Sequence, residues 1–161
     1  MKKILVGVLG LLLSYSVIAS TSKKTVQSDA AIQQTILEYI NSYRAQHHRP
    51  PLKLVPIISI EAQRHSLEMA RKQMPFGHQG FNKRIDVVYK KIKLCRGGAE
   101  NIAYMKIPAK EVARRWTESP GHRANILGNY NLTGIGIARI EGGWIYYTQM
   151  FIRSDDPSYH G

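Results

Sequence analysis

Hydrophobic residues recur at three- and four-residue steps in the first stretch of the chain that can form a helix. The stretch begins at Ser28 or Asp29, both good N-cap residues, and ends before Pro50-Pro51 because proline cannot continue a helix. Its apolar positions are Ile32, Ile36, Tyr39, Ile40 and Tyr43. This spacing predicts a helix that buries one face.

Three further segments show the same spacing. We predict a second helix from Pro56 to Met74, a third amphipathic segment that ends before Gly97-Gly98, and a fourth helix opened by Pro108. The residues expected to be buried are Ile57, Ile60, Leu67, Ala70 and Met74 in the second, Phe81, Ile85, Val88, Tyr89 and Ile92 in the third, and Ala109, Val112, Ala113 and Trp116 in the fourth. Residues 52–54 and 99–105 are expected to be extended.

The pattern becomes strand-like near the end of the chain. Residues 134–140 and 144–152 predict two strands joined through Glu141-Gly142-Gly143, a hairpin signal. The second strand is apolar on both faces, which indicates a central strand, and we expect Trp144 to be in the core. Helices early and a hairpin late predict an α+β fold, a three-layer α-β-α sandwich around a small, mainly antiparallel sheet.

The start of the chain has the layout of a secretory signal peptide. A basic start is followed by an apolar run over residues 4–13, with Val17 and Ala19 at the −3 and −1 positions of a cleavage site. A membrane anchor is the alternative, but the run is short against the roughly 20 apolar residues that a spanning helix needs. We therefore expect a signal peptide over 1–19, a flexible leader over 20–30, one domain over 31–154 and a tail over 155–161. The mature protein should be secreted or periplasmic and have no transmembrane segment.

The chain is strongly basic and has a single cysteine. Its net charge is +12, and removal of Lys2 and Lys3 with the signal peptide leaves +10. This charge favours anionic partners such as lipid headgroups or envelope components; export makes nucleic acid an unexpected partner. With Cys95 alone, no intramolecular disulfide can form, so we expect a monomer held together by its core.

The spacing of residues in one segment is enough to suggest a functional side chain. Ser119 followed by Pro120 predicts a helix start, which places His122 in the first turn. The positive end of the helix dipole favours a neutral imidazole there, able to bind a metal or accept a proton. A simple hydrogen bond to a carbonyl is an equally good interpretation. His47, His48 and His65 are expected to face solvent.

Several motifs, in this order, resemble the CAP (SCP-like) superfamily, which includes cysteine-rich secretory, antigen and pathogenesis-related proteins. They are Asn41-Ser42-Tyr43-Arg44, Leu52-Lys53-Leu54, Phe76-Gly77-His78, Ala99-Glu100-Asn101-Ile102, the segment from Ser119 to Leu127, and Tyr147-Thr148-Gln149. The resemblance runs from about Ile36 to Ile152 and is closest to the bacterial branch. Ala99 stands where the family commonly has glycine.

The resemblance implies a cleft with two histidines and two glutamates, of which His78, Glu100 and His122 match three. Glu118 is the candidate for the fourth, one position out of register, where Ser119 stands instead. Two neutral imidazoles and a carboxylate could hold Zn²⁺ or another divalent metal. The same groups could act as acid and base, or form a hydrogen-bonded cluster. Glu118, Ser119 and Gln149 are possible cleft residues.

Two functions follow from the resemblance. The first is a secreted binding module for a lipid, a sterol, or an envelope or host-surface component. The second is a metal- or His/Glu-dependent hydrolase such as a peptidase, although the chain contains neither Gly-x-Ser-x-Gly nor His-Glu-x-x-His. A Cys95 nucleophile activated by His122 is a weaker version of the second. We expect a binding module rather than an enzyme.

Overall fold

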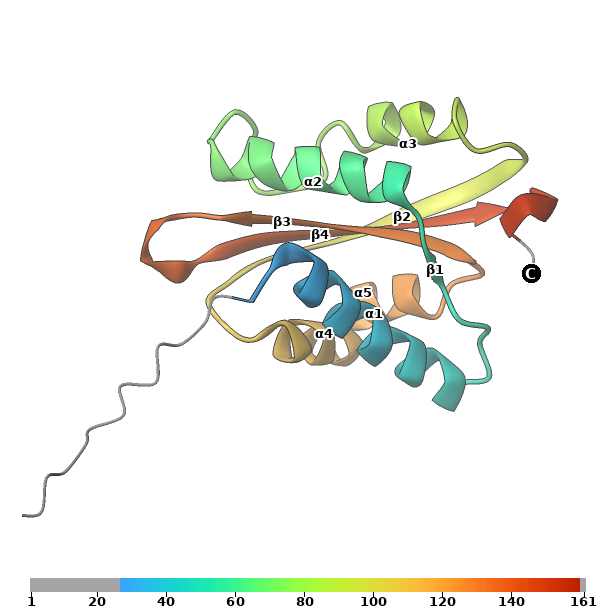
Figure 1. Ribbon diagram of the computed structural model, residues 1–161, viewed down its shortest axis with the longest axis horizontal. Helices are drawn as coiled ribbons and strands as arrows, with labels where there is room; N and C mark the ends of the chain where they lie inside the picture. The colour runs from blue at the N-terminus through green and yellow to red at the C-terminus, as the bar shows by residue number, and fades with distance from the viewer. Residues whose placement is uncertain (1–26, 160–161) are drawn as a thin grey trace, which may run out of the picture.

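The computed structural model describes residues 27–159, which form three layers. Figure 1 shows a sheet with two helices above it and three below. This arrangement confirms the predicted α+β sandwich. The expected signal peptide and most of the expected leader lie outside the described residues.

The sheet has four strands in the order β1-β3-β4-β2. They are β1 (Lys53–Leu54), β2 (Cys95–Met105), β3 (Leu132–Arg139) and β4 (Ile145–Ser154). Strand β1 is parallel to β3, whereas β4 is antiparallel to both of its neighbours. The hairpin and the central position of its second strand are therefore confirmed. The extended segment expected from Ala99 begins earlier, at Cys95.

Helices α2 (Pro56–Ala70) and α3 (Phe81–Tyr89) cover the upper face of the sheet in Figure 1. Helix α2 lies so close to β3 that a Cβ added at Gly134 or Gly136 would come within 2.2 Å of its backbone. Only glycine, which has no Cβ, allows the helix and the strand to approach this closely at these two positions. The core of this side consists of Val55, Ile58, Ala62, Ile85, Val88, Ile92, Leu132, Met150 and Ile152.

Helices α1 (Asp29–Gln46), α4 (Ala109–Glu118) and α5 (Pro120–Ile126) cover the other face. The buried residues predicted for the first and fourth helices are confirmed at Ile32, Ile36, Ile40, Ala109, Val112, Ala113 and Trp116. Arg44 is buried among them and donates to the carbonyls of Pro50, Ile126, Gly128 and Tyr130. Burial lowers the pKa of this guanidinium to about 10. Arg44 thereby ties the end of α1 to the end of α5.

The outer edge of β3 beyond its short pairing with β1 is covered by side chains. The amide of Gln63 accepts a hydrogen bond from Ile137 N at 2.7 Å and donates one to Ile137 O at 2.8 Å. Gln33 donates to Ile135 O at 2.7 Å, and Ser59 accepts from Ile135 N at 3.3 Å. Side chains of α1 and α2 thus take the place of a further strand.

Three burial predictions were wrong. The face of the second helix was misplaced: Ile60 is 59% exposed, whereas Ile58, Ala62 and Met69 are buried. The buried face also carries Glu61, His65 and Ser66, so hydrophobicity alone does not reveal it. His65 is therefore fully buried instead of solvent-facing, and Trp144, expected in the core, is 41% exposed.

Candidate functional site

The candidate site is centred on Glu100, a buried carboxylate on the α2–α3 side of β2. Arg84 of α3 reaches it from the neighbouring layer, with Nη2 2.8 Å from both carboxylate oxygens and Nε 3.0 Å from Oε2. Both side chains are almost completely removed from solvent. Such a bidentate, charge-assisted pair is strong and fixes the orientation of the carboxylate.

His78 comes from the loop between α2 and α3, and its Nδ1 lies 2.9 Å from Glu100 Oε1. A carboxylate can only accept, so Nδ1 carries the proton and a neutral ring keeps the Nε2 lone pair. The side chain of His78 is 54% exposed, which leaves this nitrogen accessible. Gly80, with φ of 73°, then turns the chain into α3. The loop thus presents an oriented imidazole at the surface above the buried ion pair.

His122 lies in the first turn of α5, as predicted. Burial, together with the nearby His78, lowers the pKa of its imidazole, so the neutral form is favoured. Asn101 and Asn125 hold α5 against β2: Asn125 Nδ2 donates to Asn101 Oδ1 at 2.8 Å and to Glu100 O at 3.2 Å. Asn101 Nδ2 donates to His122 O at 3.2 Å. The structure therefore brings His78 to Glu100, and His122 to the vicinity of His78.

The sequence interpretation missed two members of this cluster, Arg84 and His65. His65 Nε2 lies 2.8 Å from Gly77 O and 3.8 Å from Glu100 Oε1. Its Nδ1 has no hydrogen-bond partner among the described residues, and burial lowers the pKa of the ring. His65 stands three residues after buried Ala62, so a correct helical phase for α2 would have identified it.

The other possible cleft residues lie elsewhere. Glu118 is exposed on α4 and pairs with Arg114. Ser119 is half-buried at the junction of α4 and α5. Gln149 is fully buried and, being one residue from the Glu100 partner Met150, belongs to the opposite face of the sheet. Its Nε2 donates to Thr133 Oγ1 at 3.2 Å.

The arrangement does not fit a three-ligand metal centre. Within residues 27–159, no group of three or more His, Cys, Asp or Glu is placed to hold a metal ion. Both oxygens of Glu100 accept from Arg84, so a divalent ion bound there would sit beside a buried positive charge. The histidines His78 and His122 are the groups that could still offer ring nitrogens to a metal. A shallow cavity of about 320 Å³ borders His78, Gly80, Phe81, Asn82 and Lys83.

The environment of Cys95 does not suit a nucleophile, which needs a thiol with a lowered pKa. Its Sγ donates to Ile92 O at 3.3 Å, and burial raises the pKa of the thiol. It precedes Glu100 by five residues on the same strand, which corresponds to roughly 16 Å. The environment therefore favours the protonated, unreactive thiol.

A comparison with protein families settles the classification. The model of the cysteine-rich secretory protein family, CAP, matches residues 37–151. This chain belongs to the CAP family. The matched residues include His78, Glu100 and His122, so the polar cluster lies within the family domain.

Bacterial CAP proteins are among its relatives. The uncharacterized protein YkwD of Bacillus subtilis is 32% identical over 135 residues, which cover 83% of this chain and 51% of that protein. The chain thus spans about half the length of this curated relative. An extracellular protein of Bacillus anthracis that contains an SCP domain is 27% identical, with a TM-score of 0.61, over 78% of this chain and 41% of that one.

A more distant structure shares the fold. An outer surface protein of Borrelia burgdorferi has a TM-score of 0.65 at 14% identity, over 76% of this chain and 92% of that one. At this identity the likeness shows the fold alone. The three-layer architecture is therefore also found in this outer surface protein.

Proposed function

We propose that this CAP protein is an extracytoplasmic binding module whose ligand is received at His78 and His122, next to the buried carboxylate of Glu100. The observation that carries the proposal is the buried Arg84–Glu100 pair. A His/Glu hydrolase needs a carboxylate that can take a proton or hold a metal. Here both oxygens of Glu100 are committed to Arg84 and one also to His78. The pair instead makes a rigid base for an accessible imidazole.

The location outside the cytoplasm has two supports besides the signal-like start of the chain. The similar Bacillus anthracis protein is described as extracellular, and the Borrelia burgdorferi protein as an outer surface protein. Among the described residues, no helix is long and apolar enough to cross a membrane.

The proposed ligand is a lipid or another envelope or host-surface component with an anionic group. Lys83 borders the cavity at His78, and the whole chain has a net charge of +12. Excess positive charge raises the local concentration of anionic ligands. A sterol is the uncharged alternative, which would use the apolar wall supplied by Phe81.

The test is equilibrium binding of a fluorescent phosphatidylglycerol analogue below its critical micelle concentration, with cholesterol as competitor. We expect saturable binding that is weakened at least tenfold by His78→Ala combined with His122→Ala, because these two rings are the proposed ligand contacts. The matched control is His47→Ala combined with His48→Ala, at the far end of α1.

Hydrolysis is measured in parallel on a mixed peptide library. Turnover that is lost in the His78/His122 variant but kept in the His47/His48 variant would overturn the binding-module proposal in favour of a peptidase. Equal lipid binding by all three proteins would show that the cleft is not the ligand site.

For a metal ion we propose fewer ligands than the three residues that the sequence suggested. A zinc ion bound in this cleft would be held by ring nitrogens of His78 and His122, and Glu100 would join them only when Arg84 is withdrawn. Removal of Arg84 is therefore the change that should free Glu100 for a metal.

A further inference from the structure

Four aromatic side chains outside the cleft form a continuous row at the surface, here called the aromatic ridge: Phe76, Tyr104 and Trp144, which are exposed, and Tyr146, which is half-buried. The ring centroid of Tyr104 lies 4.8 Å from that of Trp144 and 4.3 Å from that of Tyr146, both in stacked geometry. Phe76 follows, 6.2 Å from Tyr146 and tilted. The row thus joins the loop after α2 to β2 and to the start of β4.

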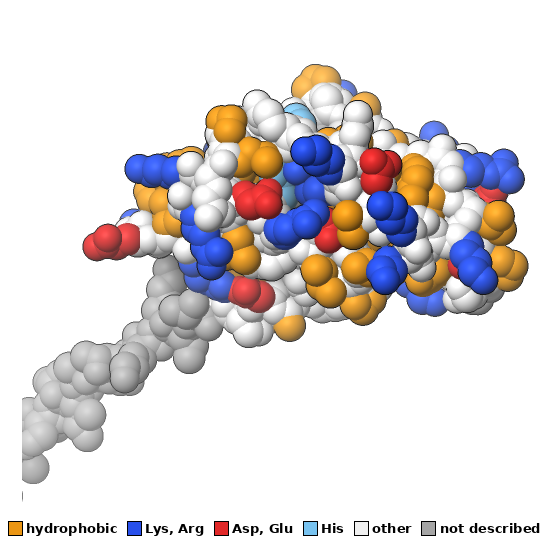
Figure 2. Space-filling model, turned by 90° about the horizontal axis from the view of Figure 1, so that it is seen from above, with side chains coloured by type: hydrophobic (Ala, Val, Ile, Leu, Met, Phe, Trp, Pro, Cys, Tyr) orange, Lys and Arg blue, Asp and Glu red, His pale blue; other side chains and the backbone are white. Residues whose placement is uncertain are grey.

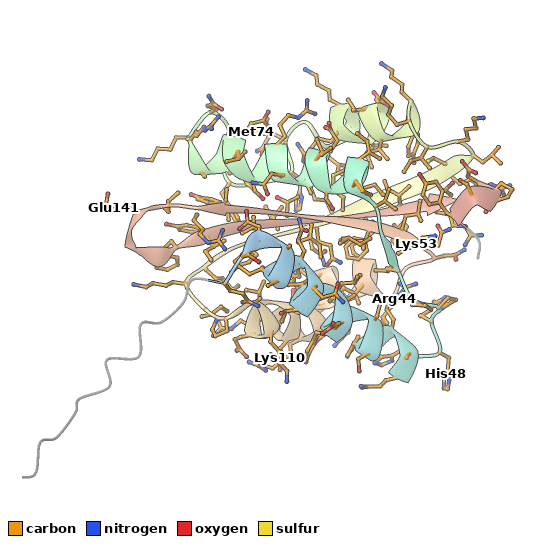
Figure 3. All side chains as sticks on the ribbon, viewed as in Figure 1. Arg44, His48, Lys53, Met74, Lys110 and Glu141 are labelled. Carbon is orange, nitrogen blue, oxygen red and sulfur yellow. The ribbon has the colours of Figure 1, made fainter. Side chains whose placement is uncertain are left out.

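The ridge is not part of either hydrophobic core. Phe76 is 54%, Trp144 41% and Tyr104 37% exposed. Figure 3 labels Met74 in the loop before Phe76 and Glu141 in the hairpin before Trp144, both toward the same end of the molecule. Large apolar side chains gathered in one exposed place indicate an interaction surface rather than chance exposure.

Stacking within the ridge limits what it can bind. Tyr104 stacks on both Trp144 and Tyr146, so its ring faces are engaged by its neighbours. A sugar ring needs a free aromatic face, which Tyr104 at the centre of the ridge does not offer, whereas a lipid surface accepts ring edges and polar ring tips. Tryptophan and tyrosine are enriched where proteins meet the headgroup region of a membrane.

The charges at this end of the molecule favour an anionic surface. Arg71 and Lys72 are exposed at the start of the loop that carries Phe76. Lys106 follows Tyr104 and lies against the hairpin turn, where its Cε would be 3.3 Å from a Cβ added at Gly143. Glu141 is the acidic residue of that turn and is outnumbered by these three cations. Figure 2 shows, on the α2–α3 face, basic side chains spread among hydrophobic and acidic ones.

We propose that the aromatic ridge, flanked by Arg71, Lys72 and Lys106, is a membrane-contact surface that inserts its ring edges into the headgroup region of an anionic bilayer. The contact is peripheral, because it combines a small apolar area with electrostatic attraction. It does not depend on the ligand proposed for the cleft, since none of the ridge residues belongs to the His78–Glu100–Arg84 cluster.

The test is sedimentation of the chain from Ser20 onward with vesicles of phosphatidylcholine alone and with 30% phosphatidylglycerol (about one lipid in three). Residues 1–19 are left out because their apolar run could itself insert. We expect binding to the anionic vesicles that weakens as salt is raised. Trp144 fluorescence should shift to the blue on binding, while Trp116, 1% exposed in the core, supplies a constant background.

Phe76→Ser combined with Trp144→Ser should weaken binding about tenfold or more, and Lys106→Glu should weaken it at low salt but not at high salt. The matched control is Ile60→Ser combined with Leu94→Ser, because these residues are 59% and 61% exposed outside the ridge. Circular dichroism checks that each variant is folded.

Three results would overturn the proposal. The first is that the folded wild type does not bind vesicles. The second is that vesicle binding is weakened equally in the ridge variant and in the control variant. The third is that the protein does not bind vesicles but is retained on insoluble cell-wall polysaccharide through the ridge residues. The last result would assign the ridge to a glycan.

Discussion

Arg84 Nη2 lies 2.8 Å from both carboxylate oxygens of Glu100, and both side chains are buried. Because both side chains are buried, bulk water cannot solvate one charge if the other is removed. Loss of one partner therefore leaves an uncompensated charge, whereas loss of both leaves an apolar gap.

We expect Arg84→Met to lower the free energy of unfolding by about 3–5 kcal/mol, and Glu100→Leu by a similar amount, because each leaves a buried charge unpaired. The double variant should lose much less than the two single losses added together. Urea unfolding of the four proteins in a double-mutant cycle measures this coupling. Additive losses would mean that the two charges do not depend on each other.

Zinc should bind more tightly when Arg84 is removed. In Arg84→Gln the Glu100 carboxylate loses its buried cation and becomes free to join His78 and His122 as a metal ligand. Calorimetric titration at pH 7.5 should show at least tenfold tighter zinc binding than in the wild type. Adding His78→Ala to the variant should remove the gain; an unchanged affinity in Arg84→Gln would show that Arg84 does not compete with a metal.

Acid should destabilise the protein through His65. Burial places the pKa of this imidazole below its unfolded value of about 6.5, so below that pH the unfolded chain binds more protons than the folded one. Stability due to the neutral ring is complete above the unfolded pKa and declines as pH falls toward the folded pKa. Urea unfolding at pH 7.5 and 5.5 should show a smaller difference for His65→Gln than for the wild type.

His122 acts in the same direction, because its pKa is also lowered, so part of the acid sensitivity should remain in His65→Gln. A variant with the full pH dependence of the wild type would contradict the role given to His65. His48→Gln is the control, since His48 is exposed.

Gly136→Ala should lower the free energy of unfolding by about 3 kcal/mol, because its Cβ would lie 2.2 Å from the backbone of Ala62 and Gln63. Backbone atoms of a helix cannot turn aside as a side chain can. The matched control in the same sheet is Gly97→Ala, where no described atom lies within 4 Å of the new Cβ. Thermal unfolding compares the two, and equal melting temperatures would show that α2 can move away from β3.

The sequence predicted the parts of the fold that local pattern controls. Pro108 and Pro120 mark helix starts, and the Glu141 turn marks a hairpin. It failed for the phase of α2, because the buried face of this helix carries the polar residues Glu61 and His65. The hydrogen-bond partner of His65, the carbonyl of Gly77, lies outside the helix and is supplied only by the folded chain.

The site was predicted only in part, because local motifs reveal some of its residues and others depend on contacts made in the fold. His78 and Glu100 stand in recognisable motifs, and the structure brings them into contact at 2.9 Å. Arg84 lies on an amphipathic helix next to Lys83, and arginine is mostly found on solvent-exposed faces. Its burial depends on a carboxylate sixteen residues later, which no local pattern can specify.

The side chains that cover the outer edge of β3 should reduce aggregation of the protein at high concentration. An open strand edge invites pairing with another chain, which begins polymerisation into fibres. Gln63 satisfies both polar backbone groups of Ile137, and Gln33 occupies Ile135 O, so an approaching strand meets an edge already used. The single cysteine, Cys95, cannot form an internal disulfide that would stabilise the fold. Gln33 and Gln63 protect the chain in another way, because they block the strand edge through which aggregation would begin.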